Sequence, residues 1–337
     1  TPAQKPPGYI SEDAVLCRSK IIAEPWDCGG GYLVGGFPGG RWSEWNDRYR
    51  NDIRRFIRGD EGVATAAATR LAGSSDLYGH SGKNPDSSVN FVSCHDGFSM
   101  NDIVSYNGKH NDENGENNRD GSDDNNCYNH GYEGVTVNPK IEALRLKKLK
   151  NFMVCLMVSQ GVPMFAAGDE FRRTQMGNNN AYCQDNEISW VNWNLEKKNQ
   201  ELFNFTRKAI QLRKMHPVFR RKKFFSGSKM EIEWYDASGK NPDWSNMKRF
   251  LSFKLVGASV VGERGEPDND FYVAGNTDIY DVTITLPTLP KGKKWYYVAD
   301  TSVAGDEGFV DCGKETVLHE QQRYVLPSGS FVILIAK

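Results

Sequence analysis

The chain has 337 residues, of which 38% are hydrophobic and 25% charged, a composition typical of a globular protein with room for two domains. Its 42 Lys and Arg nearly balance 43 Asp and Glu, for a formal net charge of -1, so nothing indicates a nucleic-acid partner or an anionic membrane surface. No apolar run approaches the length of a transmembrane helix, so no membrane partner is expected.

The first segments in chain order predict an extended lead-in, a strand and a loop. The chain opens with TPAQKPPGYI, without an initiator methionine, and we expect further residues upstream of Thr1. Thr1–Tyr9 is rich in proline and is predicted to be extended. Lys20–Pro25 (KIIAEP) is a short apolar run with polar residues at its end, which is typical of a buried parallel strand. Asp27–Gly40 is predicted to be a loop because its Gly and Pro residues disfavour regular structure.

Strands and helices then alternate. The helical patterns lie at Asn46–Arg58, Ile141–Gln160 and Glu201–Lys214, each followed within three residues by Gly or Pro. Two more strands are predicted at Val89–Asp96 and Val162–Glu170, both of which begin with apolar and end with polar residues. The alternation predicts a parallel α/β unit, and periodicity does not decide between a barrel and a doubly wound sheet.

A long polar stretch, Asn107–Gly134, interrupts this pattern and is predicted to be a functional or mobile loop. Within it, Glu116–Cys127 partly follows a calcium-loop pattern, with Gly121 in the sixth place. The first position is Glu and the last is Cys, where a bidentate Glu is required. We therefore favour a loop that binds substrate or walls a subsite, and we predict no metal.

From about Phe224 the pattern changes to short β-like runs separated by Gly, Pro, Asp and Asn, which predicts an antiparallel sandwich. We expect two domains, an α/β unit at 1–223 and an all-β domain at 224–337. The seven cysteines form no Cys-x-x-Cys pair, which is typical of reduced thiols in a reducing compartment. Cys94 and Cys155 lie in apolar runs and are predicted to be buried.

Glu24 and Asp96 are the candidate catalytic residues. Each ends a predicted parallel strand, and Asp96 follows His95 directly, so both carboxylates would lie at the same mouth of a barrel. Glycoside cleavage uses such a pair, one as an acid and one as an ionised group, and burial beside Trp26 would raise the pKa of Glu24 as an acid requires. The alternative is that both are ordinary strand-end carboxylates that cap the next helix, and spacing alone favours that alternative.

Several motifs resemble the isoamylase-type debranching enzymes of the α-amylase superfamily. They are KIIAEPWDCGGGYLVGGFP, EWNDRYRNDIRRFIRGD, VNFVSCHDGFSMNDIVSYN, KHNDENGENNRDG and QGVPMFAAGDEFRRTQMGNNNAYCQDNEISWVNW. The resemblance is dense from Lys20 to Trp193. It implies a (β/α)8 barrel followed by a β-sandwich, of which this chain would hold barrel strands five to eight. It also implies retaining hydrolysis of α-1,6 branch linkages in glycogen, amylopectin or limit dextrins.

The resemblance assigns roles to individual residues. Glu24 would be the general acid/base, Asp96 the carboxylate that stabilises the transition state, and His95 a contact to the sugar. We also place Trp26, Asp27 and Tyr32 among the substrate-binding candidates. The aromatic rings of Trp26, Tyr32, Trp42 and Trp45 could equally pack at the barrel rim.

The chain departs from the family in one respect, because no GFRFDLAS-like motif with the nucleophilic Asp of the fourth strand is present. We expect the missing half of the barrel to precede Thr1, and this chain alone to be inactive. The chemistry needs no cofactor. The alternatives are a non-catalytic glucan-binding subunit of a debranching complex and a hydrolase of α-1,4 linkages. The expected compartment is the cytoplasm or the plastid stroma.

Overall fold

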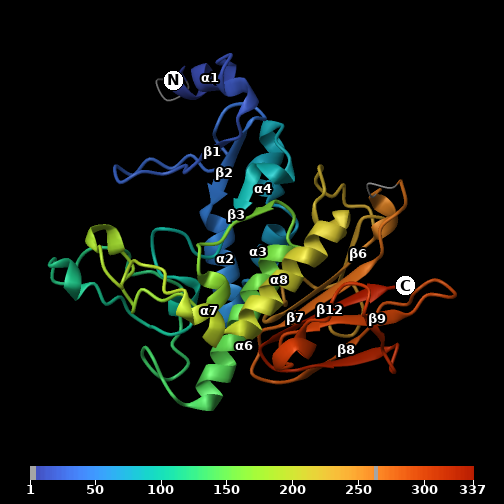
Figure 1. Ribbon diagram of the computed structural model, residues 1–337. Coiled ribbons are helices and arrows are strands. Elements are labelled where there is room, and N and C mark those ends of the chain that lie inside the picture. Colours follow the sequence, from blue (N-terminus) through green and yellow to red (C-terminus); the bar gives the residue numbers. More distant parts are fainter. Residues whose placement is uncertain (1–4, 262–264) are drawn as a thin grey trace.

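The computed structural model describes residues 5–261 and 265–337, and its first part holds a parallel sheet with helices around it (Figure 1). The sheet runs in chain order and consists of β1 (Ile21–Ala23), β2 (Trp42–Asn46), β3 (Ser88–Asn90) and β4 (Val162–Pro163). The helices are α1 (Lys5–Glu12), α2 (Asp47–Arg58), α3 (Ala64–Leu71), α4 (Ser75–Tyr78), α5 (Met100–Ile103), α6 (Pro139–Val158), α7 (Asn194–Lys198) and α8 (Gln200–Met215).

The register of this sheet aligns the carboxyl ends of its strands. Ala23 lies opposite Glu44, which lies opposite Ser88, and Val89 lies opposite Val162. The loops that leave the strands therefore emerge at one edge of the sheet, where a parallel sheet gathers its functional groups. Within the described residues, β1 and β4 each pair on one side only, so the sheet is open at both ends.

Helix α2 shows how local sequence sets the element boundaries. The Asn46 side chain accepts a hydrogen bond from the Tyr49 amide at 2.9 Å and caps the first turn. Gly59 ends the helix with φ of 98°, a left-handed conformation that glycine adopts without strain. The negative charge of Asp47 in the first turn and the positive charge of Arg58 in the last turn both interact favourably with the helix dipole.

The second part of the chain forms two antiparallel sheets. Their strands are β5 (Ile232–Tyr235), β6 (Phe250–Leu255), β7 (Phe271–Asn276), β8 (Val282–Thr285), β9 (Trp295–Asp300), β10 (Thr316–Val317), β11 (Arg323–Leu326) and β12 (Ser330–Ala336). One sheet has the order β10-β9-β12-β7-β6-β5, and β11 pairs with β8 in the other.

Strand β12 lies at the centre of the core, and its continuous apolar run reflects burial on both faces. Phe331 and Ile333 point into the cluster shared with the helices, where Phe331 meets Phe56 of α2 edge-on at 6.2 Å. Val332 and Leu334 point the other way, into a second cluster with residues of β8 and β11. Because successive side chains of a strand point to opposite faces, β12 packs against the helices with one face and against the second sheet with the other.

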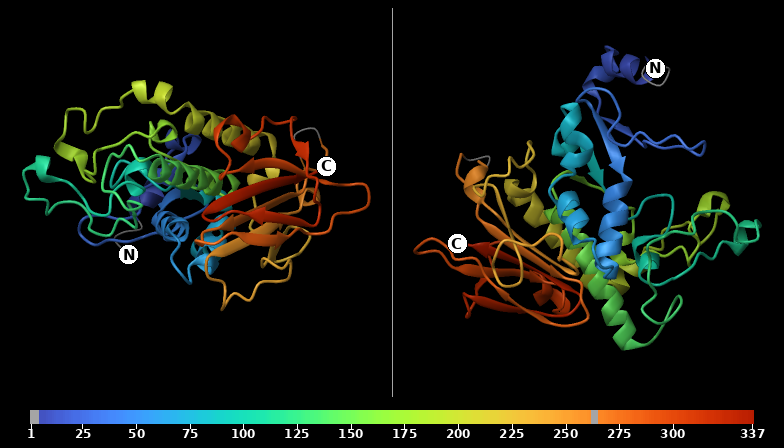
Figure 2. Two further views of the ribbon diagram at one scale, coloured as in Figure 1. Left: turned by 90° about the horizontal axis from the view of Figure 1, so that it is seen from below. Right: turned by 180° about the vertical axis from the view of Figure 1, so that it is seen from behind.

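Polar side chains of α6 reach the antiparallel part as well. Asn151 donates to the Gly329 carbonyl at 2.8 Å, and Lys150 donates to the Val303 carbonyl at 2.9 Å. Both side chains are buried, so these bonds satisfy groups that water does not reach. Figure 2 shows that the helices lie between the loops of the first part and the antiparallel sheets.

Some expectations from the sequence need correction. Residues 5–9 belong to helix α1 and are not extended, while residues 1–4 lie outside the described chain. The strands expected at Val89–Asp96 and Val162–Glu170 end at Asn90 and Pro163, because the chain leaves the sheet before the polar residues. β2, β5 and β10 were not expected.

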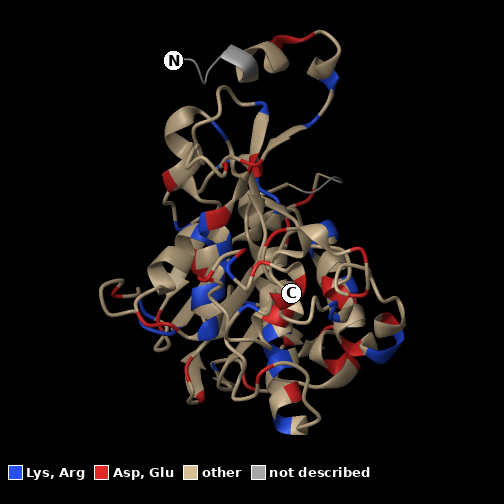
Figure 3. Cartoon of the chain, turned by 90° about the vertical axis from the view of Figure 1, so that its left-hand side faces the viewer, with Lys and Arg blue, Asp and Glu red and all other residues tan. Residues whose placement is uncertain are grey.

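Other expectations are confirmed. The three helices appear as α2, α6 and α8, and Cys94 and Cys155 are both buried. Within the described part of the chain, no helix is both long and apolar enough to span a bilayer. Acidic and basic residues are interspersed over the helices and loops, in keeping with the balanced charge (Figure 3).

Candidate functional site

Glu24, His95 and Asp96 converge at the carboxyl edge of the parallel sheet. Glu24 directly follows β1, and the other two lie in the segment after β3. A carboxylate oxygen of Glu24, a ring nitrogen of His95 and a carboxylate oxygen of Asp96 all lie within 4.8 Å of one another. The distance from His95 Nε2 to Asp96 Oδ1 is 3.5 Å. The geometry expected of the two strand-end carboxylates is therefore present.

All three side chains are exposed. For Glu24 this differs from the expected burial beside Trp26, because β1 is a strand with one free edge and nothing in the described chain covers the carboxylate. The three side chains are also the one group in the described residues whose spacing suits a metal ion. Exposed carboxylates gather without a metal where sugar is cleaved, so this spacing does not assign one.

Trp45 of β2 positions His95. The two rings meet edge-on with centroids 5.5 Å apart, and Trp45 also packs on Phe91 at 5.5 Å. Trp42 lies three positions earlier, on the other face of β2, and is buried. It packs on Phe37 with ring centroids 5.0 Å apart and donates to the Ser11 hydroxyl at 2.7 Å. Trp45 thus lies beside His95, whereas Trp42 packs against Phe37.

A cavity of about 570 Å³ opens beside His95 and Asp96, within the size range of small-molecule sites. Its lining comes from β2 and from the segments after β3 and β4. The lining residues are Trp45, Ser93, Cys94, His95, Asp96, Met164, Phe165, Ala166, Ala167, Arg173, Gln175, Ala181, Tyr182, Ser189 and Val191. The mixture of aromatic, aliphatic and polar groups suits a sugar, which has apolar ring faces and hydroxyl edges.

Two buried charged side chains hold the segment that carries His95 and Asp96. On one side Arg54 of α2 donates to the Val92 carbonyl at 2.7 Å, and burial lowers the pKa of its guanidinium to about 9. On the other side the Asp169 carboxylate accepts hydrogen bonds from the Ser93 hydroxyl and from the Met100 amide at 2.9 Å. Burial raises the pKa of Asp169 to about 6 despite these bonds.

The remaining substrate-binding candidates lie on the loop between β1 and β2. Asp27 accepts hydrogen bonds from the Gly29 and Gly31 amides at 2.7 and 3.0 Å and so shapes a turn. The Tyr32 hydroxyl donates to Asp47 at 2.7 Å, and Tyr32 forms a backbone bridge with Trp26. Neither these two residues nor Trp26 is among those that line the cavity.

The long loop Asn107–Gly134 supports the cavity from outside, since it supplies none of the lining residues. Asn111 and Asn179 exchange two hydrogen bonds of 2.9 Å, one between their side-chain amides and one from the Asn179 backbone amide to Asn111 Oδ1. The Asn179 carbonyl accepts from the Gly97 amide at 2.9 Å, directly after Asp96. The loop expected to bind substrate or wall a subsite thus reaches the site through Asn179.

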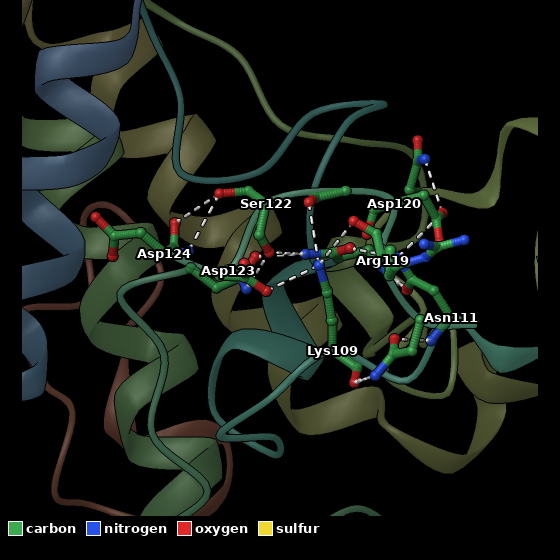
Figure 4. Close-up of polar contacts among 12 residues, drawn as sticks. Lys109, Asn111, Arg119, Asp120, Ser122, Asp123 and Asp124 are labelled. Carbon is green, nitrogen blue, oxygen red and sulfur yellow. Dashed lines mark hydrogen bonds and ion pairs between the residues drawn. The ribbon is translucent and has the colours of Figure 1, made fainter. Parts of the chain in front are cut away.

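Lys109 fills the centre of the segment that resembles a calcium loop (Figure 4). Its ammonium group is 2.8 Å from Asp123 Oδ1 and donates to the carbonyls of Gly121 and Arg119 at 3.3 and 3.5 Å. Carbonyls and a carboxylate are the ligands that calcium prefers. Here a lysine supplies the positive charge to them.

Arg173 and Tyr182 line the cavity and Asp169 supports it, and the sequence singled out none of the three. Asp169 follows a strand-end apolar run, the same pattern that pointed to Glu24 and Asp96. Tyr182 lies in the quoted GNNNAYCQDN stretch. Their positions depend on contacts between segments about 70 residues apart in the chain, such as Ser93 with Asp169, which periodicity does not report.

Residues 231–335 match the isoamylase C-terminal family. The chain is 46% identical over 309 residues to the Glycogen operon protein GlgX homolog of Mycobacterium tuberculosis (strain ATCC 25618 / H37Rv), covering 87% of this chain and 43% of that protein. It is 42% identical over 331 residues to Isoamylase 3, chloroplastic, of Oryza sativa subsp. japonica, covering 97% of this chain and 40% of that protein. The chain thus spans about two-fifths of the length of these relatives.

Solved structures of similar fold include two pullulanases. The pullulanase type I from Bacillus subtilis str. 168, complexed with maltose, superposes with a TM-score of 0.69 at 20% identity, covering 97% of this chain and 41% of that one. The pullulanase from Bacillus acidopullulyticus gives a TM-score of 0.66 at 19% identity, covering 96% and 35%. At this level of identity the likeness concerns the fold.

Proposed function

We propose that this chain is the C-terminal part of an isoamylase-type debranching enzyme, a retaining hydrolase of α-1,6-glucosidic branch linkages, because residues 231–335 match the isoamylase C-terminal family and the similar proteins include a GlgX homolog and an isoamylase. The substrate would be glycogen, amylopectin or a limit dextrin. The observation that carries the proposal is the convergence of Glu24, His95 and Asp96 beside a cavity at the carboxyl edge of parallel strands.

The proposed chemistry assigns one task to each of the three groups. Glu24 donates a proton to the leaving glycosidic oxygen and, as a carboxylate, later takes a proton from the attacking water. Asp96 and His95 bind hydroxyls of the distorted sugar and stabilise the positive charge that develops on its ring. We further propose Trp26, Asp27 and Tyr32 as substrate contacts on the loop that leaves β1. No cofactor takes part.

The proposal also makes the parallel sheet of this chain one half of a larger barrel. We propose that β1 to β4 are strands five to eight of a (β/α)8 barrel, and that residues 1–223 and 224–337 are separate domains. The open edges of the parallel sheet and the start of the antiparallel strands at Ile232 support this division. The remaining barrel strands would pair with β1 and β4 and bring the nucleophilic Asp opposite Glu24. This chain alone would then be inactive, because removal of a nucleophile removes most of the catalysis.

The relatives also suggest where the protein works. The similar plant isoamylases from Oryza sativa, Zea mays and Arabidopsis thaliana are described as chloroplastic, and other similar proteins come from mycobacteria. We propose the cytoplasm or the plastid stroma, where the seven free cysteines would remain reduced.

The test is hydrolysis by the complete protein of amylopectin and, separately, of linear amylose, followed through new reducing ends. The proposal predicts release from amylopectin, with shorter linear chains as products, and none from amylose. Release from amylose at a similar rate would instead indicate an α-1,4 hydrolase. Binding of amylopectin without any release would indicate the non-catalytic glucan-binding subunit.

A further inference from the structure

Tyr182 is an exposed aromatic residue at the cavity that holds His95 and Asp96. Its side chain is 68% exposed, yet it is among the residues that line the cavity. Single exposed aromatic residues are common on protein surfaces, so exposure alone assigns no role. Tyr280 in the antiparallel part is exposed to 73%, for example, and lines none of the cavities described here.

What distinguishes Tyr182 is that its ring is held in place. Its hydroxyl donates to Glu116 Oε1 at 2.5 Å, and this bond raises the pKa of the phenol to about 12. Glu116 comes from the long polar loop, 66 positions away in the chain. An exposed tyrosine ring would otherwise rotate freely, and a fixed ring loses less entropy when a ligand packs on it.

The backbone on both sides of Tyr182 is braced as well. Asn180 donates to Asp120 at 2.9 Å, and Gln184 donates to Asn114 at 2.7 Å. The chain turns through a short 3-10 helix at Ala181–Cys183 between these two contacts. The ring is therefore carried by a rigid turn, which is what a binding platform requires.

Polar groups line the same cavity as the ring. Arg173 donates to the Ser189 carbonyl at 2.8 Å, while its buried Nε has no hydrogen-bond partner in the described chain. An aromatic face with polar side chains at its edge matches a glucosyl unit, whose C–H faces are apolar and whose hydroxyls lie around the rim.

We propose that Tyr182 is a specificity-determining residue on which a glucosyl ring of the α-glucan chain stacks, beside the position where the bond is cleaved. Glu116 holds the ring in the orientation that receives the sugar. The proposal rests on the proposed function, and it assigns to the loop that contains Glu116 a part in substrate selection. It predicts that longer chains, which extend from His95 and Asp96 to Tyr182, gain affinity from this contact.

The experiment is a calorimetric titration of the complete protein with maltoheptaose. Tyr182→Ala is expected to bind about tenfold more weakly than the wild type, which corresponds to about 1.4 kcal/mol. Tyr182→Phe keeps the ring but loses the bond to Glu116, and its affinity is expected to lie between those of the wild type and Tyr182→Ala. Tyr280→Ala, which removes an equally exposed ring elsewhere, is expected to bind like the wild type.

The outcomes separate the two proposals. If the wild type binds maltoheptaose and Tyr182→Ala binds it equally well, the inference about Tyr182 is overturned and the proposed function stands. If Tyr182→Phe loses as much affinity as Tyr182→Ala, the ring is not the contact and the inference fails. If the wild type does not bind maltoheptaose at all, the inference and the proposed glucan specificity fail together.

Discussion

Asp169 shows how a single buried residue positions the site without taking part in it. Its carboxylate contacts Ser93 and the Met100 amide, on either side of His95 and Asp96 in the chain. A third bond, from the Ala166 amide at 3.2 Å, ties it to the segment after β4. One side chain thus fixes two segments that line the same cavity.

Asp169 should also make stability depend on pH. Burial raises its pKa from an ordinary 3.8 to about 6, so the folded protein binds this proton more tightly than the unfolded chain. The resulting stabilisation is complete below pH 3.8 and is lost as the pH rises through 6. Asp169→Asn removes this dependence, so the wild type should lose about 2 kcal/mol relative to the variant between pH 4 and 7.

Urea unfolding of both proteins across that pH range measures the difference. Asp112→Asn, at an exposed carboxylate, is the control and should leave the pH dependence unchanged. Parallel stability curves for the wild type and Asp169→Asn would show that the Asp169 carboxylate titrates normally.

At the residue scale, the sequence pointed to the acids that follow the apolar runs around β1 and β3. Glu24 and Asp96 were found because an apolar run followed by an acid marks the carboxyl end of a parallel strand. Tyr182 was not found, because its position depends on a hydrogen bond to Glu116 across 66 residues. Burial of Glu24 was expected and is absent, since burial depends on neighbours that a strand pattern does not reveal.

Among the elements, the loop around Lys109 is stabilised by an internal charge. The Lys109 side chain is only 8% exposed, while that of its partner Asp123 is 90% exposed. Hydrogen bonds from a charged donor stabilise a fold more than neutral ones. Loss of the ammonium group would leave the Gly121 and Arg119 carbonyls without this hydrogen-bond donor. The loop should therefore depend on this one side chain for its order.

Lys109→Met keeps the aliphatic stem and removes the charge. We expect faster amide exchange across 109–124, because the loop loses a contribution of about 1–3 kcal/mol. Lys197→Met removes an exposed lysine that forms no ion pair within the described chain, and it should leave exchange in this loop unchanged. Wild-type exchange rates in Lys109→Met would mean that the backbone holds the loop without the ammonium group.

At the element scale, helices were easier to predict than strands. α2, α6 and α8 are 12, 20 and 16 residues long and carry capping or stop residues that the sequence displays. β3 and β4 have only three and two residues, so the apolar runs around them overstate their length. β2 was overlooked because its five residues, WSEWN, contain three polar positions and no β-branched residue.

For the whole molecule, the open parallel sheet is the feature with the largest consequence. β1 pairs only with β2 in the described chain, and its Ile22 side chain is 52% exposed. A free strand edge with apolar side chains offers hydrogen bonds and apolar surface to another chain. The general architecture, parallel sheet first and antiparallel sheets second, was predictable from the change in pattern near Phe224.

Free edges should make the isolated chain associate. Sedimentation velocity at increasing concentration is expected to show self-association of the wild type and less of it for Ile22→Lys, because a lysine on an edge strand opposes pairing. Ile279→Lys changes an even more exposed isoleucine outside the parallel sheet and should associate like the wild type. A wild type that remains monomeric at all concentrations would show that the edges are protected.

The central claim is that Glu24 is the acid/base of a retaining hydrolase, and azide rescue of Glu24→Gln in the complete protein tests it most directly. The amide neither donates nor accepts the proton, so hydrolysis of a branched glucan should fall by about 10² to 10⁴. Azide needs no general base and should react with the glucosyl-enzyme, restoring turnover of an activated α-glucosyl fluoride and giving an α-glucosyl azide. Hydrolysis by Glu24→Gln at the wild-type rate would contradict the account.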